Sequence, residues 1–150
     1  MRIALSADHA GYELKDLLAA WLAEAGHEVI DLGTNGPESV DYPRYGAALA
    51  EALADGRAER GITVCGSGIG IAIAANRNPA CRCAQVAEPL SATLARQHND
   101  CNAIALGARL TIFSDAISSI WVCSRNSSAA IPAATAESAS ASLRVKKPSG

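Results

Sequence analysis

The sequence lacks the features that mark a membrane, secreted or nucleic-acid-binding protein. No apolar run is long enough to span a bilayer, and the N-terminus leads into a strand pattern without the apolar core of a signal peptide, so we expect a cytoplasmic protein. The formal net charge of the 150 residues is −2, which gives no indication of nucleic-acid binding. With 49% hydrophobic and 19% charged residues, the composition is that of one globular domain large enough to bury a core.

Motifs for disulfides, metals and nucleotides are missing as well. The five cysteines are an odd number without the spacing of a disulfide framework, and the three histidines lack metal-ligand spacing. Residues 66–70 form a glycine-rich stretch, but Ile71 stands where the dinucleotide fingerprint needs its last glycine, and no Gly-Lys-Ser/Thr ending follows. We therefore expect reduced thiols, no metal and no cofactor.

Residues 62–76 carry the strongest chemical signal in the chain. An apolar, β-branched run ends at Cys65, the glycine loop follows, and a small-residue helical pattern comes next. Glycines allow close approach to a ligand, and free N–H groups at such a turn make a pocket for negative charge. A helix N-terminus also favours the thiolate, which is the reactive form of cysteine. The segment offers a candidate base beside a candidate oxyanion hole, although by itself it fits a capping turn with an inert, buried cysteine slightly better.

Short strands alternate with helices, which predicts a Rossmann-like three-layer α/β/α fold with a five-stranded parallel sheet. The expected strands are residues 2–6, 28–31, 62–65, 82–86 and 103–106, and the expected helices are residues 12–25, 44–54, 71–75, 90–97 and 111–122. The carboxyl ends of parallel strands share one edge of the sheet, where ligands bind. Asp8, Cys65 and Arg109 follow three of these strands, so we expect them to converge.

The composition changes towards the end of the chain. We expect one domain over residues 1–123. Residues 124–142 are almost entirely Ser, Ala, Thr and Asn, and the last residues are basic. Such a segment buries little apolar surface, so residues 124–150 are predicted to be a weakly ordered tail.

Several short motifs, taken together, resemble the ribose-5-phosphate isomerase B family, which includes the galactose-6-phosphate isomerase subunits. They are Ser-Ala-Asp-His-Ala-Gly (6–11), Asp-Leu-Gly-Thr (31–34), Glu-Ser-Val-Asp-Tyr-Pro (38–43), Cys-Gly-Ser-Gly-Ile-Gly (65–70), Ala-Ala-Asn (74–76), Glu-Pro (88–89), Arg-Gln-His-Asn-Asp (96–100) and Gly-Ala-Arg (107–109). They follow the family's order and spacing from residue 1 to about residue 110. The family's later Gly-Gly-Arg-His type motif, whose arginines bind the substrate phosphate, has no counterpart here.

The resemblance implies a metal-free aldose–ketose isomerase that interconverts ribose 5-phosphate and ribulose 5-phosphate through an enediolate. It also implies a homodimer with active sites at the subunit interface. By this likeness Cys65 moves the proton between C1 and C2, and Ser67 with the amides of residues 66–70 holds the enediolate oxygens. His98 opens the furanose ring, helped by Asp100 or Asn99. The residues that the likeness assigns to substrate binding are Asp8, His9, Tyr42, Gly66, Gly68, Ile69, Gly70, Asn99 and Arg109.

Residue chemistry supports these roles independently. Removing a proton beside a carbonyl needs a base near neutral pH and donors aimed at the oxyanion, which Cys65 and its loop supply. Ring opening needs a group that exchanges protons near pH 7, a property of His98 at a helix end. For Asp8 a helix cap remains an alternative, and for Tyr42 core packing does. Two other functions stay open: isomerisation of a six-carbon sugar phosphate, and sugar-phosphate binding with impaired turnover because the later arginines are missing.

Overall fold

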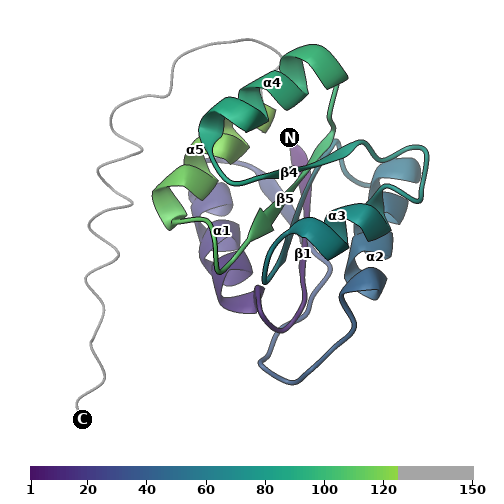
Figure 1. The fold of residues 1–150 in the computed structure, drawn as a ribbon, viewed down its shortest axis with the longest axis vertical. Helices are drawn as coiled ribbons and strands as arrows, with labels where there is room; N and C mark the ends of the chain where they lie inside the picture. The colour runs from purple at the N-terminus through teal and green to yellow at the C-terminus, as the bar shows by residue number, and fades with distance from the viewer. Residues whose placement is uncertain (125–150) are drawn as a thin grey trace.

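The computed structural model describes residues 1–124, which form five strands and five helices in alternation (Figure 1). The strands are β1 (Arg2–Ala7), β2 (Glu28–Asp31), β3 (Arg60–Cys65), β4 (Cys83–Val86) and β5 (Ala103–Gly107). The helices are α1 (Tyr12–Glu24), α2 (Tyr42–Ala54), α3 (Ile69–Ala75), α4 (Pro89–Asn99) and α5 (Phe113–Ser124). No helix in this part of the chain is long and apolar enough to cross a membrane. The predicted tail lies outside the described residues, apart from Ser124.

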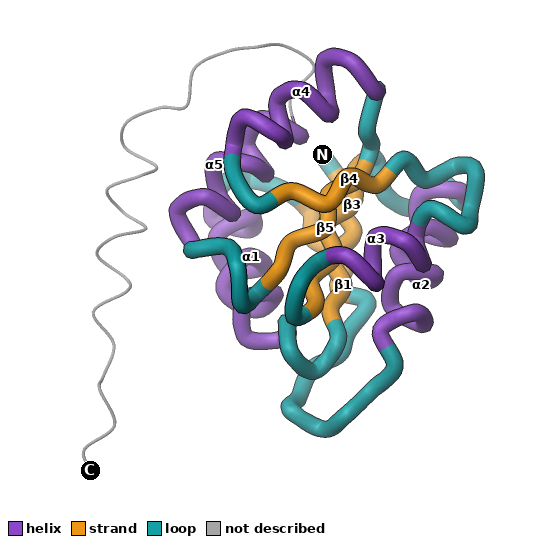
Figure 2. Tube along the Cα trace, viewed as in Figure 1, coloured by secondary structure: helices purple, strands orange, loops and turns teal. Residues whose placement is uncertain are grey.

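All strands are parallel and lie in the order β2-β1-β3-β5-β4. Ala7 pairs with Val64, and Cys65 pairs with Gly107, so β1, β3 and β5 end at the same level in the middle of the sheet. Figure 2 shows the sheet between α1 and α5 on one side and α2 and α3 on the other. The predicted Rossmann-like fold with a five-stranded parallel sheet is confirmed.

Apolar side chains cover both faces of the sheet. On one face, Leu18, Leu22 and Ile117 from the helices pack against larger strand residues such as Leu5 and Leu106. The other face packs α2 and α3 against small strand residues, and its buried members include Ala4, Leu49, Ile71, Ala103 and Ala105. Burial of each Leu or Ile contributes about 1.5–3 kcal/mol. A parallel sheet buried on both faces therefore anchors the loops at its carboxyl edge.

Two helix ends differ from the prediction and bear on the site. Gly68 precedes α3 in the left-handed conformation (φ 78°), which lets the helix begin at Ile69, two residues earlier than predicted. α4 continues through Asn99, so His98 belongs to its last turn. At its other end, α4 begins at Pro89 after Glu88, whose carboxylate accepts N–H bonds from Leu90 (2.7 Å) and Ser91 (2.8 Å).

Candidate active site

A pocket of about 590 Å³ lies at the carboxyl edge of the sheet. Its walls come from the segments after β1, β3 and β5, together with the start of α2 and of α3. The lining residues are Asp8, His9, Ala10, Tyr42, Cys65, Gly66, Ser67, Ile69, Gly70, Arg109 and Leu110. The expected convergence of Asp8, Cys65 and Arg109 is therefore confirmed.

Cys65 is the last residue of β3, and its side chain is buried beneath the glycine loop. The N–H of Gly68 donates to Sγ of Cys65 at 3.1 Å. A Cβ on Gly68 would lie 2.9 Å from the carbonyl carbon of Leu106, so glycine is required by space as well as by its positive φ. The glycine loop therefore places one backbone N–H donor directly on the sulfur.

Ser67 is held at the pocket by contacts on both sides. Its Oγ accepts a hydrogen bond from the N–H of Ile69 at 3.3 Å, and its carbonyl accepts one from Nε2 of Gln85 at 3.3 Å. A Cβ on Gly107 would lie 2.7 Å from the same carbonyl oxygen. The glycine on β5 therefore allows the loop to lie directly against the sheet, which fixes the position of the Ser67 hydroxyl.

Asp8 has a structural role and also lines the pocket. Its Oδ1 accepts N–H bonds from Ala10 at 2.9 Å and Gly11 at 3.2 Å in the turn that leads into α1. The side chain is buried, and it forms part of the pocket wall. The helix cap left open by the sequence is not formed, because the N-cap residue of α1 is Gly11 and no side chain caps this helix. The carboxylate instead holds the turn before α1, and these bonds fix its orientation at the pocket wall.

His9, the next residue, accepts a hydrogen bond at Nδ1 from the N–H of Val40, at 3.2 Å. A neutral imidazole that accepts at Nδ1 carries its proton on Nε2, so Val40 selects the tautomer in which Nε2 is a donor. Nothing in the sequence could have identified Val40, because its contribution is a backbone amide brought to His9 by the loop between β2 and α2.

Tyr42 begins α2 and is 43% exposed, which excludes core packing as its role. Its ring lies on the first turn of α3. A Cβ on Gly70 would come within 2.8 Å of two ring carbons, so the absence of a side chain there makes room for the tyrosine. Tyr42 therefore forms a pocket wall beside the first turn of α3.

Arg109 follows the end of β5, and its guanidinium lies over Gly66. A Cβ on Gly66 would be 3.4 Å from Cζ and from Nη1 of the arginine. The backbone N–H of Arg109 donates to the carbonyl of Gly66 at 3.1 Å. A cation is thereby fixed beside the loop that carries Ser67, where it can attract an anionic substrate.

His98, Asn99 and Asp100 lie elsewhere. α4 runs antiparallel to the strands, so its end and the following residue lie at the amino edge of the sheet, before β5 starts. None of the three lines the pocket. One copy of the chain therefore brings Asp8, His9, Tyr42 and Cys65 together but keeps His98 apart from them.

The described residues contain no candidate metal centre. Within residues 1–124, no group of three or more His, Cys, Asp or Glu side chains is arranged to hold a metal ion. Ala10 and Leu110 also line the pocket, but neither carries a reactive group that would identify it from the sequence.

Comparisons with known proteins agree with this architecture. A family model described as Ribose/Galactose Isomerase matches residues 3–135. The ribose-5-phosphate isomerase B of Escherichia coli is 48% identical over 109 residues, covering 73% of this chain and 73% of that protein. The enzyme of the same name from Mycobacterium tuberculosis is 41% identical over 118 residues, covering 78% and 73%. The solved ribose-5-phosphate isomerase B of Clostridium thermocellum has a TM-score of 0.80 and 45% identity, covering 82% of this chain and 83% of that one. The chain is an isomerase and belongs to the ribose/galactose isomerase family.

Proposed function

We propose that this protein interconverts ribose 5-phosphate and ribulose 5-phosphate. The main support is the arrangement of Cys65 at the pocket wall, with an N–H donor on its sulfur and a glycine loop beside it. The names of the Escherichia coli and Mycobacterium tuberculosis relatives favour the five-carbon substrate.

In the proposed reaction Cys65 acts as the base. The thiolate removes the proton from C2 of the open-chain aldose, and the resulting thiol returns it to C1. The proton of the C2 hydroxyl passes to the oxygen on C1, which yields the ketose. Negative charge develops on the enediolate oxygens between these steps, and donors preorganised at that position lower the barrier. Ser67 and the backbone amides of residues 66–70 supply these donors.

The remaining pocket residues bind the substrate. We assign Asp8 and Tyr42 to the sugar hydroxyls, since both line the pocket and carry oxygen atoms that form hydrogen bonds with hydroxyl groups. His9 and Arg109 are assigned to the phosphate end. The donor at Nε2 of a neutral His9 and the guanidinium of Arg109 both suit an anion.

Ring opening requires a second copy of the chain in this proposal. His98 is at the amino edge of the sheet and Cys65 at the carboxyl edge, so His98 must act in the pocket of a partner, with Asn99 beside it. We therefore propose a homodimer with active sites at the interface, working in the cytoplasm. Exposed apolar side chains on α3 next to the pocket, Ile69 (54% exposed) and Ile73 (58%), support such an interface, because a second copy would cover them.

A second candidate is a sugar-phosphate-binding homologue with impaired turnover. It is favoured by one observation: within residues 1–124, Arg109 is the only arginine that lines the pocket. Fewer charge-assisted contacts would hold the phosphate more weakly. A six-carbon sugar phosphate is the remaining alternative as substrate.

The test is the rate of ribulose 5-phosphate formation by the 150-residue chain in the presence of a chelator. We expect turnover of ribose 5-phosphate that exceeds turnover of a six-carbon aldose 6-phosphate. Absence of turnover, combined with a rise in melting temperature on adding ribose 5-phosphate, would favour the binding homologue. A preference for the six-carbon substrate would contradict the proposed specificity.

A further inference from the structure

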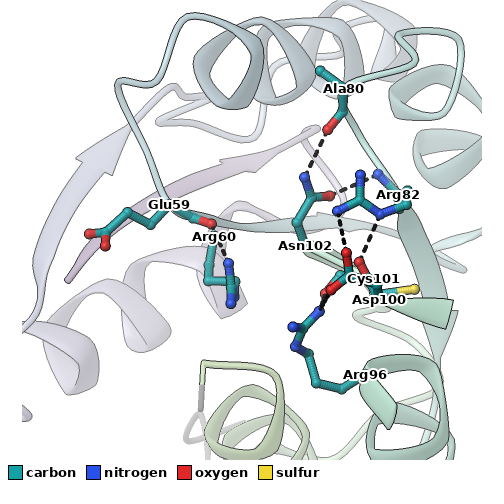
Figure 3. A network of polar contacts seen from close by, with 8 residues as sticks. All are labelled: Glu59, Arg60, Ala80, Arg82, Arg96, Asp100, Cys101 and Asn102. Carbon is teal, nitrogen blue, oxygen red and sulfur yellow. Dashed lines mark hydrogen bonds and ion pairs between the residues drawn. The ribbon is translucent and has the colours of Figure 1, made fainter. Parts of the chain in front are cut away.

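The residue that follows α4, directly after His98 and Asn99, is held by two arginines from separate elements (Figure 3). Arg96 lies four residues before Asp100, and Arg82 directly precedes β4. Nη1 of Arg96 donates to Oδ1 of Asp100 at 2.8 Å, and Nη2 of Arg82 donates to Oδ2 at 3.1 Å. Both carboxylate oxygens of Asp100 are therefore occupied by guanidinium groups.

The same arginines also hold the backbone of this turn. Nε of Arg82 donates to the carbonyl of Asp100 at 2.8 Å, and Nη1 of Arg96 donates to the carbonyl of Cys101 at 2.7 Å. Asp100 has a φ of 48°, in the left-handed region that is unfavourable for a residue with a Cβ. The two guanidinium groups offset this cost and fix the direction in which the chain leaves α4.

The charge state of Asp100 argues against a role as a proton carrier. The hydrogen bond from Arg96 is the largest cause that lowers the pKa of this carboxyl group, followed by the charges of Arg96 and Arg82. The group is ionised near neutral pH, and both of its oxygens already accept charged donors. Such a carboxylate is a weak acceptor for a proton from a sugar hydroxyl.

We propose that Arg82, Asp100 and Arg96 act as a positioning clamp for His98 and Asn99, and that Asp100 takes no part in the proton transfer of ring opening. The proposal rests on the proposed function, since it assumes that His98 opens the ring. The side chain of Asp100 is 71% exposed, and exposed ion pairs contribute little to global stability. The clamp should therefore affect the geometry of one turn and leave the free energy of unfolding almost unchanged.

Two substrates separate ring opening from proton transfer. Ribose 5-phosphate is mainly cyclic, whereas ribulose 5-phosphate stays open-chain because its phosphate occupies the hydroxyl that would close the ring. For Arg82→Gln and Asp100→Asn we expect a fall of about tenfold in kcat for ribose 5-phosphate. Exchange of the C1 proton of ribulose 5-phosphate with solvent should stay within about twofold of the parent. The double variant should be no slower than the slower single one, because both changes break the same unit.

The control variant is Arg57→Gln, which removes an equally exposed arginine whose ion pair with Asp55 lies outside the turn. It should leave both rates unchanged. Amide hydrogen exchange over residues 99–102 gives a readout without substrate, and Arg82→Gln should speed it with little change in melting temperature.

Three outcomes would overturn the proposal. If Asp100→Asn abolishes ribose 5-phosphate turnover while Arg82→Gln leaves it intact, Asp100 acts directly in the chemistry. If His98→Asn slows ring opening but neither Arg82→Gln nor Asp100→Asn does, the clamp is refuted and the proposed function stands. If His98→Asn leaves ribose 5-phosphate turnover unchanged, the ring-opening role of His98 fails and the clamp has no function to serve.

Discussion

Lys15 provides the most direct test of how this fold holds its loops. Its side chain is fully buried, and Nζ donates to Asp31 at 2.6 Å, to Asn35 at 3.1 Å and lies 2.8 Å from a carboxylate oxygen of Asp16. The three acceptors match the three donors of an ammonium group. α1 is thereby joined to the end of β2 and to the loop that contains Val40, whose N–H donates to His9.

Replacing Lys15 with Met keeps much of the side-chain volume but removes the charge. Breaking a fully buried ion pair costs about 3–5 kcal/mol, because the partner is left unpaired. Here the carboxylates of Asp31 and Asp16 are 40% and 56% exposed, so water takes over part of the solvation. We therefore expect Lys15→Met to lower the free energy of unfolding by about 2–3 kcal/mol.

The pH dependence has a definite sign. Burial is the largest single influence on the pKa of Lys15 and lowers it, but hydrogen bonds and charges from Asp16 and Asp31 together outweigh burial and raise the pKa above 10.5. The stabilisation by Lys15 is thus complete below pH 10.5 and is lost as the pH rises through the higher folded-state pKa. The difference between the parent and Lys15→Met should shrink only at strongly alkaline pH.

The assay is urea unfolding at a fixed protein concentration, so that any association contributes equally. Arg57→Met is the control, because it removes a cation whose ion pair with Asp55 is exposed. It should change the free energy of unfolding by less than about 0.5 kcal/mol. A loss of less than about 1 kcal/mol for Lys15→Met at neutral pH would refute the reasoning, since a buried three-acceptor site cannot contribute so little.

Three further changes test other parts of the structure. Gly70→Ala places a Cβ 2.8 Å from the ring of Tyr42 and should displace the ring. We expect KM to rise about threefold or more in steady-state kinetics, and an unchanged KM would contradict the contact between Gly70 and Tyr42. Burial, with the charge of the N-terminus, lowers the pKa of His27 below 6.5, so the free energy of unfolding decreases as the pH falls below that value. In urea unfolding at decreasing pH, His27→Gln should make this decrease smaller. The hydroxyl of Ser119 is buried without a partner among the described residues, so Ser119→Ala should raise the unfolding free energy by about 1 kcal/mol, and a loss would mean that the hydroxyl is bonded.

The fold was largely predictable because its signals are local. Each apolar run of four to six residues followed by a helical pattern identifies one strand and one helix, and the parallel arrangement then follows from their alternation. The start of α3 was missed because it depends on the left-handed Gly68, and no apolar periodicity marks such a turn.

The site was predictable in part for the same reason. Parallel topology alone requires Asp8, Cys65 and Arg109 to meet at one edge, and the pocket contains all three. The same topology places the end of α4 at the opposite edge of the sheet. His98 and Cys65, which the family resemblance assigns to one active site, therefore lie apart within a single chain. The contacts of Lys15 and Arg82 could not be predicted from the sequence, because each joins residues from separate segments that no local pattern connects.

The central claim is that Cys65 moves the proton between C1 and C2. Its most direct test is solvent deuterium exchange at C1 of ribulose 5-phosphate by Cys65→Ala, compared with Cys81→Ala, which removes a buried thiol outside the pocket. We predict that Cys81→Ala exchanges at the parent rate, whereas Cys65→Ala loses about a hundredfold or more while its melting temperature stays close to that of the parent. Exchange by Cys65→Ala at the parent rate would contradict the account, because another group would then have to be the base.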